Sequence, residues 1–209
     1  MSRIAAVSLD VHGTLLLLAE PVSFTYAQAA GEDVDEVAAR LRRAWDLPKP
    51  APGGWRGYWR RVVTMAIGRD DPDVFQRLWA HYARPEAWQV APGAPAAVDR
   101  LRRTGVPVGI TSNADARLRP LLSELGWLQR LDAFVISDEI GIAKPDPRIF
   151  AHTAAALGVA NGALVHLGDS RSEDVAGARA AGCHAWHFTT DLPHFDELAD
   201  RVQATGTPS

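Results

Sequence analysis

Three aspartates and a lysine stand at positions along the chain where their side chains could do chemistry together. Asp10 and Asp169 each follow a short apolar run, Asp174 lies five residues further on, and Lys144 begins a Lys-Pro-Asp-Pro segment. Carboxylates that converge on one point repel one another unless a cation joins them, and hard oxygen ligands select Mg²⁺, which also takes a phosphate oxygen. The residue types therefore predict a Mg²⁺ site formed by Asp10, Asp169 and Asp174.

The same residues predict nucleophilic chemistry on a phosphoryl group. A carboxylate between Mg²⁺ and a lysine stays ionised, so Asp10 could attack phosphorus and form an aspartyl-phosphate that water then hydrolyses. Lys144 could offset the charge of this nucleophile and hold a phosphoryl oxygen, and the Ser112 hydroxyl could bond another. Thr14 and Asn113 are further candidates for substrate binding, although each could instead bond to the loop that carries it.

Short apolar runs alternate with amphipathic segments over most of the chain. The runs predict buried strands at residues 4–9, 106–111, 133–136, 163–167 and 185–188. The amphipathic segments predict helices at 94–103, 116–125, 148–157 and 174–181. This alternation is typical of an α/β fold with a doubly wound parallel sheet. Ligands of such sheets bind beyond the carboxyl ends of the strands, where Asp10, Ser112 and Asp169 stand.

An insert at residues 17–91 has helical patterning and almost no strand signal, so we expect an α-helical cap there. The α/β core would then comprise residues 1–16 and 92–209. Asp71 followed by Pro72 predicts the start of a helix within the insert. Most tryptophans fall in this segment at the spacing of a packed helical face, which favours the interior of a small subdomain over an aromatic lid.

Composition excludes several classes of protein. The chain has 209 residues, of which 47% are hydrophobic and 22% charged, and these values are typical of a globular protein with a sizeable core. A single cysteine, Cys183, excludes a disulfide scaffold and favours a reducing compartment, so we expect a cytoplasmic protein. The net charge of −3 gives no attraction for nucleic acid, and no apolar segment is long enough for a membrane span.

Four motifs in order resemble those of the haloacid dehalogenase-like (HAD) hydrolase superfamily. They are the Asp10–Thr14 loop, Ser112-Asn113, the Lys144-Pro145-Asp146-Pro147 element, and Gly168-Asp169-Ser170 followed by Asp174. The resemblance spans essentially the whole core. It implies a Rossmann-like core with a helical cap inserted after the first motif, Mg²⁺ dependence, and hydrolysis of a small phosphorylated metabolite.

One position departs from the phosphatase pattern of this superfamily. Phosphatases that the chain resembles carry a second Asp two places after the nucleophile, where it protonates the leaving alkoxide and later activates water. This chain has His12 there. The backbone carbonyl of His12 can still coordinate Mg²⁺, so the resemblance keeps it in the metal site. Its imidazole could transfer protons, change the choice of substrate, or mark a lost catalytic step.

Two alternative functions follow from His12. The first is a catalytically weak or inactive regulatory module that keeps the Mg²⁺ and phosphate pocket. The second is the dehalogenase branch, whose members carry a non-acidic residue at this position and attack carbon without a metal. Retention of both Asp169 and Asp174 disfavours the dehalogenase. Elsewhere, we expect Asp146 to cap a helix and His166 to be a buried core residue.

Overall fold

The computed structural model describes residues 3–205 and divides into two compact units. One unit combines the segment that ends at Leu17 with the chain from Val90 onward, and the other is Leu18–Gln89. Strands β2 (Leu16–Leu18) and β3 (Trp88–Val90) pair where the chain passes from one unit to the other. Among the helices of residues 3–205, none is long and apolar enough to cross a lipid bilayer.

A five-stranded parallel sheet forms the centre of the first unit within residues 3–205. The strand order is β5-β4-β1-β6-β7. Their bounds are Ala6–Leu9 for β1, Val108–Ser112 for β4, Ala133–Ile136 for β5, Leu164–Gly168 for β6 and His184–His187 for β7. The three central strands are buried at every residue, as strands covered on both faces must be. The prediction of a doubly wound α/β fold is therefore confirmed.

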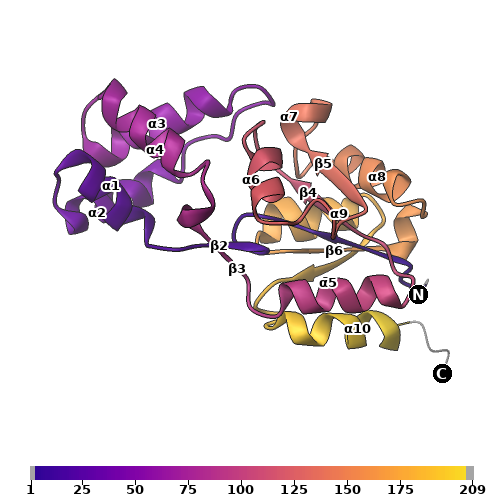
Figure 1. Ribbon diagram of the computed structural model, residues 1–209. Coiled ribbons are helices and arrows are strands. Elements are labelled where there is room, and N and C mark those ends of the chain that lie inside the picture. The colour runs from indigo at the N-terminus through magenta and orange to yellow at the C-terminus, as the bar shows by residue number, and fades with distance from the viewer. Residues whose placement is uncertain (1–2, 206–209) are drawn as a thin grey trace. The chain divides into compact units, whose positions relative to one another are not determined.

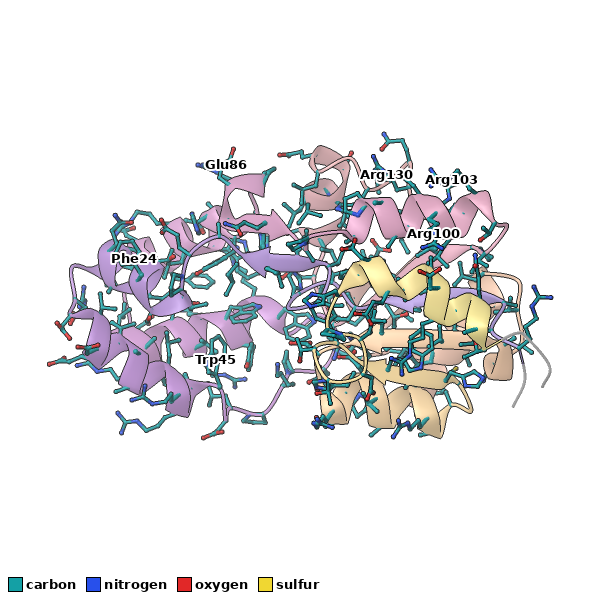
Figure 2. All side chains as sticks on the ribbon, turned by 90° about the horizontal axis from the view of Figure 1, so that it is seen from below. Phe24, Trp45, Glu86, Arg100, Arg103 and Arg130 are labelled. Carbon is teal, nitrogen blue, oxygen red and sulfur yellow. The ribbon has the colours of Figure 1, made fainter. Side chains whose placement is uncertain are left out.

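Helices cover both faces of this sheet (Figure 1). On one side α5 (Ala94–Arg103) lies beside α10 (Leu198–Ala204), and the other side carries α8 (Pro147–Ala156) and α9 (Gly177–Ala180). Figure 2 shows Arg100 on α5, whose guanidinium pairs with Asp200 of α10. Two further short helices are α6 (Leu118–Glu124) and α7 (Ser137–Ile140), and a π-helical turn at Arg171–Ala176 precedes α9. As expected, Asp146 caps α8 by accepting a hydrogen bond from the backbone N–H of Arg148.

The second unit is a bundle of four helices among its described residues. They are α1 (Val22–Ala30), α2 (Val34–Ala44), α3 (Trp55–Ile67) and α4 (Pro72–His81). The predicted start of α4 is confirmed, since Asp71 accepts hydrogen bonds from two backbone N–H groups and Pro72 is the first helical residue. The buried interior includes Trp55 and Tyr58, whereas Phe24 and Trp45 each keep 43% of their surface exposed (Figure 2).

The sequence prediction did not include strands β2 and β3 or helices α1, α7 and α10. Strands β2 and β3 have only three residues each, too few to show an alternating pattern. Helix α1 follows Pro21 without a side-chain cap, and its apolar residues do not gather on one face. The predicted helix at 174–181 is present in part, because the π-helical turn occupies its first residues.

Candidate active site

The carboxyl ends of the parallel strands bring the predicted site residues together. Asp10 directly follows β1, Ser112 is the last residue of β4, and Asp169 directly follows β6. Strand β1 pairs with both β4 and β6, so these three strand ends are neighbours. Lys144 lies in the loop that leads to α8, and Asp174 lies in the π-helical turn after β6. Sequence positions far apart thus meet at one edge of the sheet.

Lys144 forms a double ion pair at the centre of this edge. Its Nζ lies 2.6 Å from Oδ1 of Asp10 and 2.6 Å from Oδ1 of Asp174. All three side chains are buried, with the Lys144 side chain only 2% exposed. A buried lysine is stable as a cation only when it is paired, and these two carboxylates satisfy that need.

The three aspartates form a cluster that could hold a cation. Asp10, Asp169 and Asp174 each offer a carboxylate oxygen, and these oxygens lie within 4.8 Å of one another. Their three negative charges face the single positive charge of Lys144. Because this balance leaves excess negative charge in a largely buried place, the donor set fits a hard divalent ion such as Mg²⁺.

The pKa values of the cluster reflect this charge balance. Burial, together with Asp174 and Asp169, raises the pKa of Asp10 from 3.8 to about 7 in spite of Lys144. Burial also acts to raise the pKa of Asp174, but Lys144 and His166 outweigh it and hold that pKa below its ordinary range. The two carboxylates in turn raise the pKa of Lys144 against the effect of burial. Lys144 favours the charged form of Asp174, whereas the pKa values of Asp10 and Asp169 are both raised by burial and by Asp174, so a further cation would stabilise these two carboxylates.

Two glycines allow carboxylates of the candidate metal site to approach the backbone. A Cβ on Gly168 would lie 2.3 Å from Cγ of Asp174, and a Cβ on Gly13 would lie 2.4 Å from Oδ2 of Asp169. Both distances are far below a normal contact between such atoms. Gly13 also has a φ of +89°, a conformation that side chains disfavour. There is no room for a side chain at either position, so both motif residues must be glycine.

Two buried hydroxyls lie among the predicted substrate-binding residues. The Oγ of Ser112 and the Oγ1 of Thr14 are buried, and within residues 3–205 neither makes a hydrogen bond. A buried hydroxyl without a partner costs free energy. These two groups are therefore available to bond a ligand oxygen.

Asn113 has a different role from its neighbour Ser112. Its Oδ1 accepts a hydrogen bond from the backbone N–H of Lys144 at 2.7 Å, and its Nδ2 donates to the backbone O of Lys144 at 2.9 Å. Nδ2 also donates to Oε2 of Glu173 at 3.1 Å. Of the two roles that the sequence left open for Asn113, these contacts favour shaping the loop that carries Lys144.

His12 lies in the loop after Asp10 and is half-buried. Burial lowers its pKa from 6.5 to about 4, and the cations Lys144 and Arg117 act in the same direction, whereas Asp115 opposes them. Asp115 and Arg117, which follow β4, form a part-buried ion pair at 2.7 Å. Sequence reasoning missed this pair, since neither residue belongs to a motif.

Sequence reasoning also missed the contact that His166 makes with Asp174 beneath the site. His166 is fully buried within β6, and its Nε2 lies 3.0 Å from Oδ1 of Asp174. Burial lowers the pKa of His166 although Asp174 opposes this effect. The expectation that His166 is a buried residue is confirmed. The only sequence signal for its contact with Asp174 is a polar residue inside an apolar run.

The sequence matches a known protein family and several of its members. Residues 4–182 match the family model described as haloacid dehalogenase-like hydrolase. The chain belongs to this family. It is 32% identical over 213 residues to haloacid dehalogenase-like hydrolase domain-containing protein 3 of Mus musculus, covering 92% of this chain and 85% of the relative. It is 35% identical over 175 residues to a phosphoserine phosphatase of Thermus thermophilus, covering 81% and 69% respectively.

Solved structures in this HAD family share the fold. A HAD phosphatase from Thermococcus onnurineus aligns with a TM-score of 0.68 and 24% identity, covering 98% of this chain and all of that one. A 2-haloacid dehalogenase from Pseudomonas syringae aligns with a TM-score of 0.64 and 22% identity, covering 96% and 98%. Phosphatases and dehalogenases therefore share this architecture, and the choice between the two chemistries depends on the site residues.

Proposed function

We propose that this HAD-like hydrolase is a Mg²⁺-dependent phosphomonoesterase that uses Asp10 as its nucleophile. The observation that carries the proposal is the buried Asp10 carboxylate at the end of β1, held by Lys144 at 2.6 Å and joined by two more carboxylates. A nucleophile with a fixed cation on one side and a candidate metal site on the other suits attack on a dianion.

Asp10, Asp169 and Asp174 would hold the metal, together with the backbone carbonyl of His12. When bound, Mg²⁺ would neutralise the excess negative charge of the cluster and attract a phosphoryl oxygen. Burial and the neighbouring carboxylates raise the pKa of Asp10, and a metal ion bound there would favour its ionised form. Lys144 favours the ionised form of Asp10 that nucleophilic attack needs.

The first half of the proposed reaction transfers the phosphoryl group to Asp10. Ser112 and Thr14 donate their free hydroxyls to phosphoryl oxygens, and Lys144 adds its charge. Since Lys144 bonds to Oδ1 of Asp10, Oδ2 is the oxygen that attacks phosphorus. The P–O ester bond breaks with its electron pair going to the leaving alkoxide, which takes a proton from water or from the small protonated fraction of His12, whose pKa of about 4 leaves most of it neutral near pH 7.

The second half returns the enzyme to its starting state. A water oxygen attacks phosphorus, the bond to Asp10 breaks, and the carboxylate recovers its electron pair. The proton of the attacking water passes to His12 or to solvent. Such proton transfers contribute roughly 10²–10⁴-fold to rate, so a His12 that does no proton transfer would leave a slow enzyme.

Release of p-nitrophenol from p-nitrophenyl phosphate tests the proposal. We expect turnover with Mg²⁺, loss of that turnover after chelation, and no turnover in Asp10→Asn. Equal activity in Asp10→Asn would contradict the assignment of the nucleophile. The Glu86→Gln variant serves as a control, because this exposed side chain lies outside the described cluster.

A second function, a metal- and phosphate-binding module with weak turnover, is favoured by His12. The His12→Asp variant separates the two. If His12 works in the present mechanism, the variant loses activity. If His12 does no proton transfer and the natural protein is therefore slow, the variant gains activity by a large factor.

Release of chloride from 2-chloropropionate tests the dehalogenase alternative, which the acidic pair Asp169 and Asp174 disfavours.

We also propose a small phosphorylated metabolite as substrate and a cytoplasmic location. The phosphoserine phosphatase relative supports the substrate class, and the lone cysteine supports the location. A screen of phosphorylated metabolites for released phosphate tests the substrate class, and a fluorescent fusion in the native host tests the location.

A further inference from the structure

A chain of buried polar side chains crosses the sheet beneath the candidate metal site. His166 Nδ1 lies 3.0 Å from Ser8 Oγ, which lies 2.7 Å from Thr111 Oγ1, and this hydroxyl lies 2.7 Å from Oγ1 of Thr153. All four side chains are fully buried. At its other end this series of side chains reaches Asp174, because His166 Nε2 lies 3.0 Å from Oδ1 of Asp174.

The strand register explains why these residues meet. Ser8 on β1 is paired with His166 on β6 and with Gly109 on β4, and Thr111 lies two residues beyond Gly109. Side chains alternate along a strand, so Ser8, His166 and Thr111 point to the same face of the sheet. Thr153 reaches them from α8, which covers that face.

Gly168, on the same face of the sheet, makes room for the Asp174 carboxylate. It lies two residues after His166, so a side chain there would also point toward Asp174, and its absence leaves room for that carboxylate. Asp174 is then held from three sides. Oδ1 accepts from Lys144 Nζ and faces His166 Nε2, and Oδ2 accepts from the backbone N–H of Ser170 at 2.9 Å.

The hydrogen bonds of this series of side chains can run in either of two directions, and both require a proton on Nε2 of His166. If His166 carries its proton on Nε2, that N–H donates to Asp174, and Nδ1 accepts from the Ser8 hydroxyl. Ser8 then accepts from Thr111, and Thr111 accepts from Thr153 only if the Thr153 hydroxyl turns away from the backbone O of Ile149, which lies 3.0 Å from it. If Thr153 donates to Ile149 instead, Thr111 donates to Thr153, Ser8 donates to Thr111, and Nδ1 of His166 carries a second proton that it donates to Ser8. If a neutral ring carried its proton only on Nδ1, two lone pairs would face each other across 3.0 Å. The carboxylate therefore selects the ring form with a proton on Nε2, whether or not Nδ1 is also protonated.

We infer that His166 is a positioning residue of the active site, which holds the Asp174 carboxylate in the orientation that metal binding requires. The inference rests on the proposed function, because it assigns Asp174 to the metal. Groups that orient a metal ligand from behind typically contribute 10- to 100-fold to metal affinity. A side chain that merely filled space would contribute through its volume, whereas His166 acts through the donor at Nε2.

Two amide variants separate these roles. His166→Gln places an amide nitrogen where Nε2 of histidine lies and keeps a donor for Asp174. His166→Asn is shorter, so its amide reaches Ser8 but not Asp174. We would measure the dissociation constant of Mn²⁺, added alone, by electron paramagnetic resonance. We expect roughly a 10- to 100-fold rise for His166→Asn and less than about a threefold change for His166→Gln.

Thr153→Val is the matched control. It removes a hydroxyl from the far end of the chain and leaves the His166–Asp174 contact in place, so we expect less than about a threefold change in Mn²⁺ affinity. Unchanged affinity in His166→Asn, or an equal loss in both amide variants, would overturn the inference while leaving the metal site standing. A wild-type protein that binds no Mn²⁺ would refute the proposed metal site itself.

Nuclear magnetic resonance of the wild-type protein tests the contact without any variant. Long-range ¹H–¹⁵N spectra report which ring nitrogen of His166 carries a proton. A proton on Nε2 supports the inference. A ring protonated only on Nδ1 would overturn it, even if the amide variants failed to fold.

Discussion

Replacing Gly168 by alanine should displace the Asp174 carboxylate of the proposed metal site with a single methyl group. The added Cβ would lie 2.3 Å from Cγ of Asp174, 2.5 Å from Oδ2 and 2.7 Å from Cβ. Ordinary contacts begin near 3.4 Å, so the carboxylate must move by about 1 Å. Asp174 is buried and cannot make this movement without losing hydrogen bonds.

The cost follows from the contacts that the movement breaks. Asp174 accepts from Lys144 at 2.6 Å and from Ser170 N–H at 2.9 Å, and His166 Nε2 lies at 3.0 Å. Overpacking costs about 1–3 kcal/mol. A lost hydrogen bond to a charged group costs about 1.5–3 kcal/mol. We therefore expect Gly168→Ala to lower the free energy of unfolding by about 3–5 kcal/mol and to abolish Mn²⁺ binding.

Urea denaturation followed by circular dichroism measures the first effect, and Mn²⁺ titration measures the second. Gly57→Ala is the control, because a Cβ on this exposed glycine of α3 would meet no atom within 4 Å. We expect that variant to gain about 0.5–1 kcal/mol from helix propensity. A Gly168→Ala protein with wild-type stability and Mn²⁺ affinity would refute the reasoning about close approach.

Three further predictions concern single side chains. Lys144→Met leaves two buried carboxylates without their cation, and we expect about 3–5 kcal/mol loss of stability in urea denaturation; wild-type stability would contradict this. Burial raises the pKa of Cys183 to about 11, so its thiolate is scarce at pH 8. Its reaction with Ellman's reagent should therefore be roughly 100-fold slower than that of free cysteine. A reaction as fast as that of free cysteine would contradict this prediction. The backbone N–H of Val74, which donates to the Asp71 carboxylate, lowers the pKa of Asp71 below 3.8. The ionised carboxylate therefore stabilises α4 fully above about pH 4, and this stabilisation is lost as the pH falls through the pKa of Asp71 in the folded protein. Asp71→Asn keeps the cap, so its Tm should fall less than that of the wild type from pH 5 to pH 3; parallel Tm curves would refute this.

Much of the fold follows from local patterns in the sequence. The strands β1, β4, β5 and β6 are short and mostly apolar, and polar motif residues stand at the ends of β1, β4 and β6. Pairing of parallel strands then brings Asp10, Ser112 and Asp169 to one edge, as the alternation of strands and helices predicts. Local caps such as Asp71 and Asp146 were equally predictable, because each contacts backbone within three residues.

The remaining features depend on contacts between distant residues. The Lys144–Asp10 pair joins positions 134 residues apart, and the His166–Ser8 contact joins positions 158 residues apart. No local pattern indicates that Lys144 bonds to two carboxylates or that Asn113 holds the backbone of Lys144. The chain of hydroxyls beneath the site depends on strand register, which a sequence of short apolar runs does not specify.

Trapping of the covalent intermediate tests the central claim most directly. The protein would be mixed with p-nitrophenyl phosphate and Mg²⁺, quenched in acid and digested, and its peptides would be weighed by mass spectrometry. We predict phosphate on the peptide that contains Asp10, and none on the same peptide from Asp10→Asn. Turnover by the wild-type protein with no phosphate on Asp10, together with unchanged turnover in Asp10→Asn, would contradict the account.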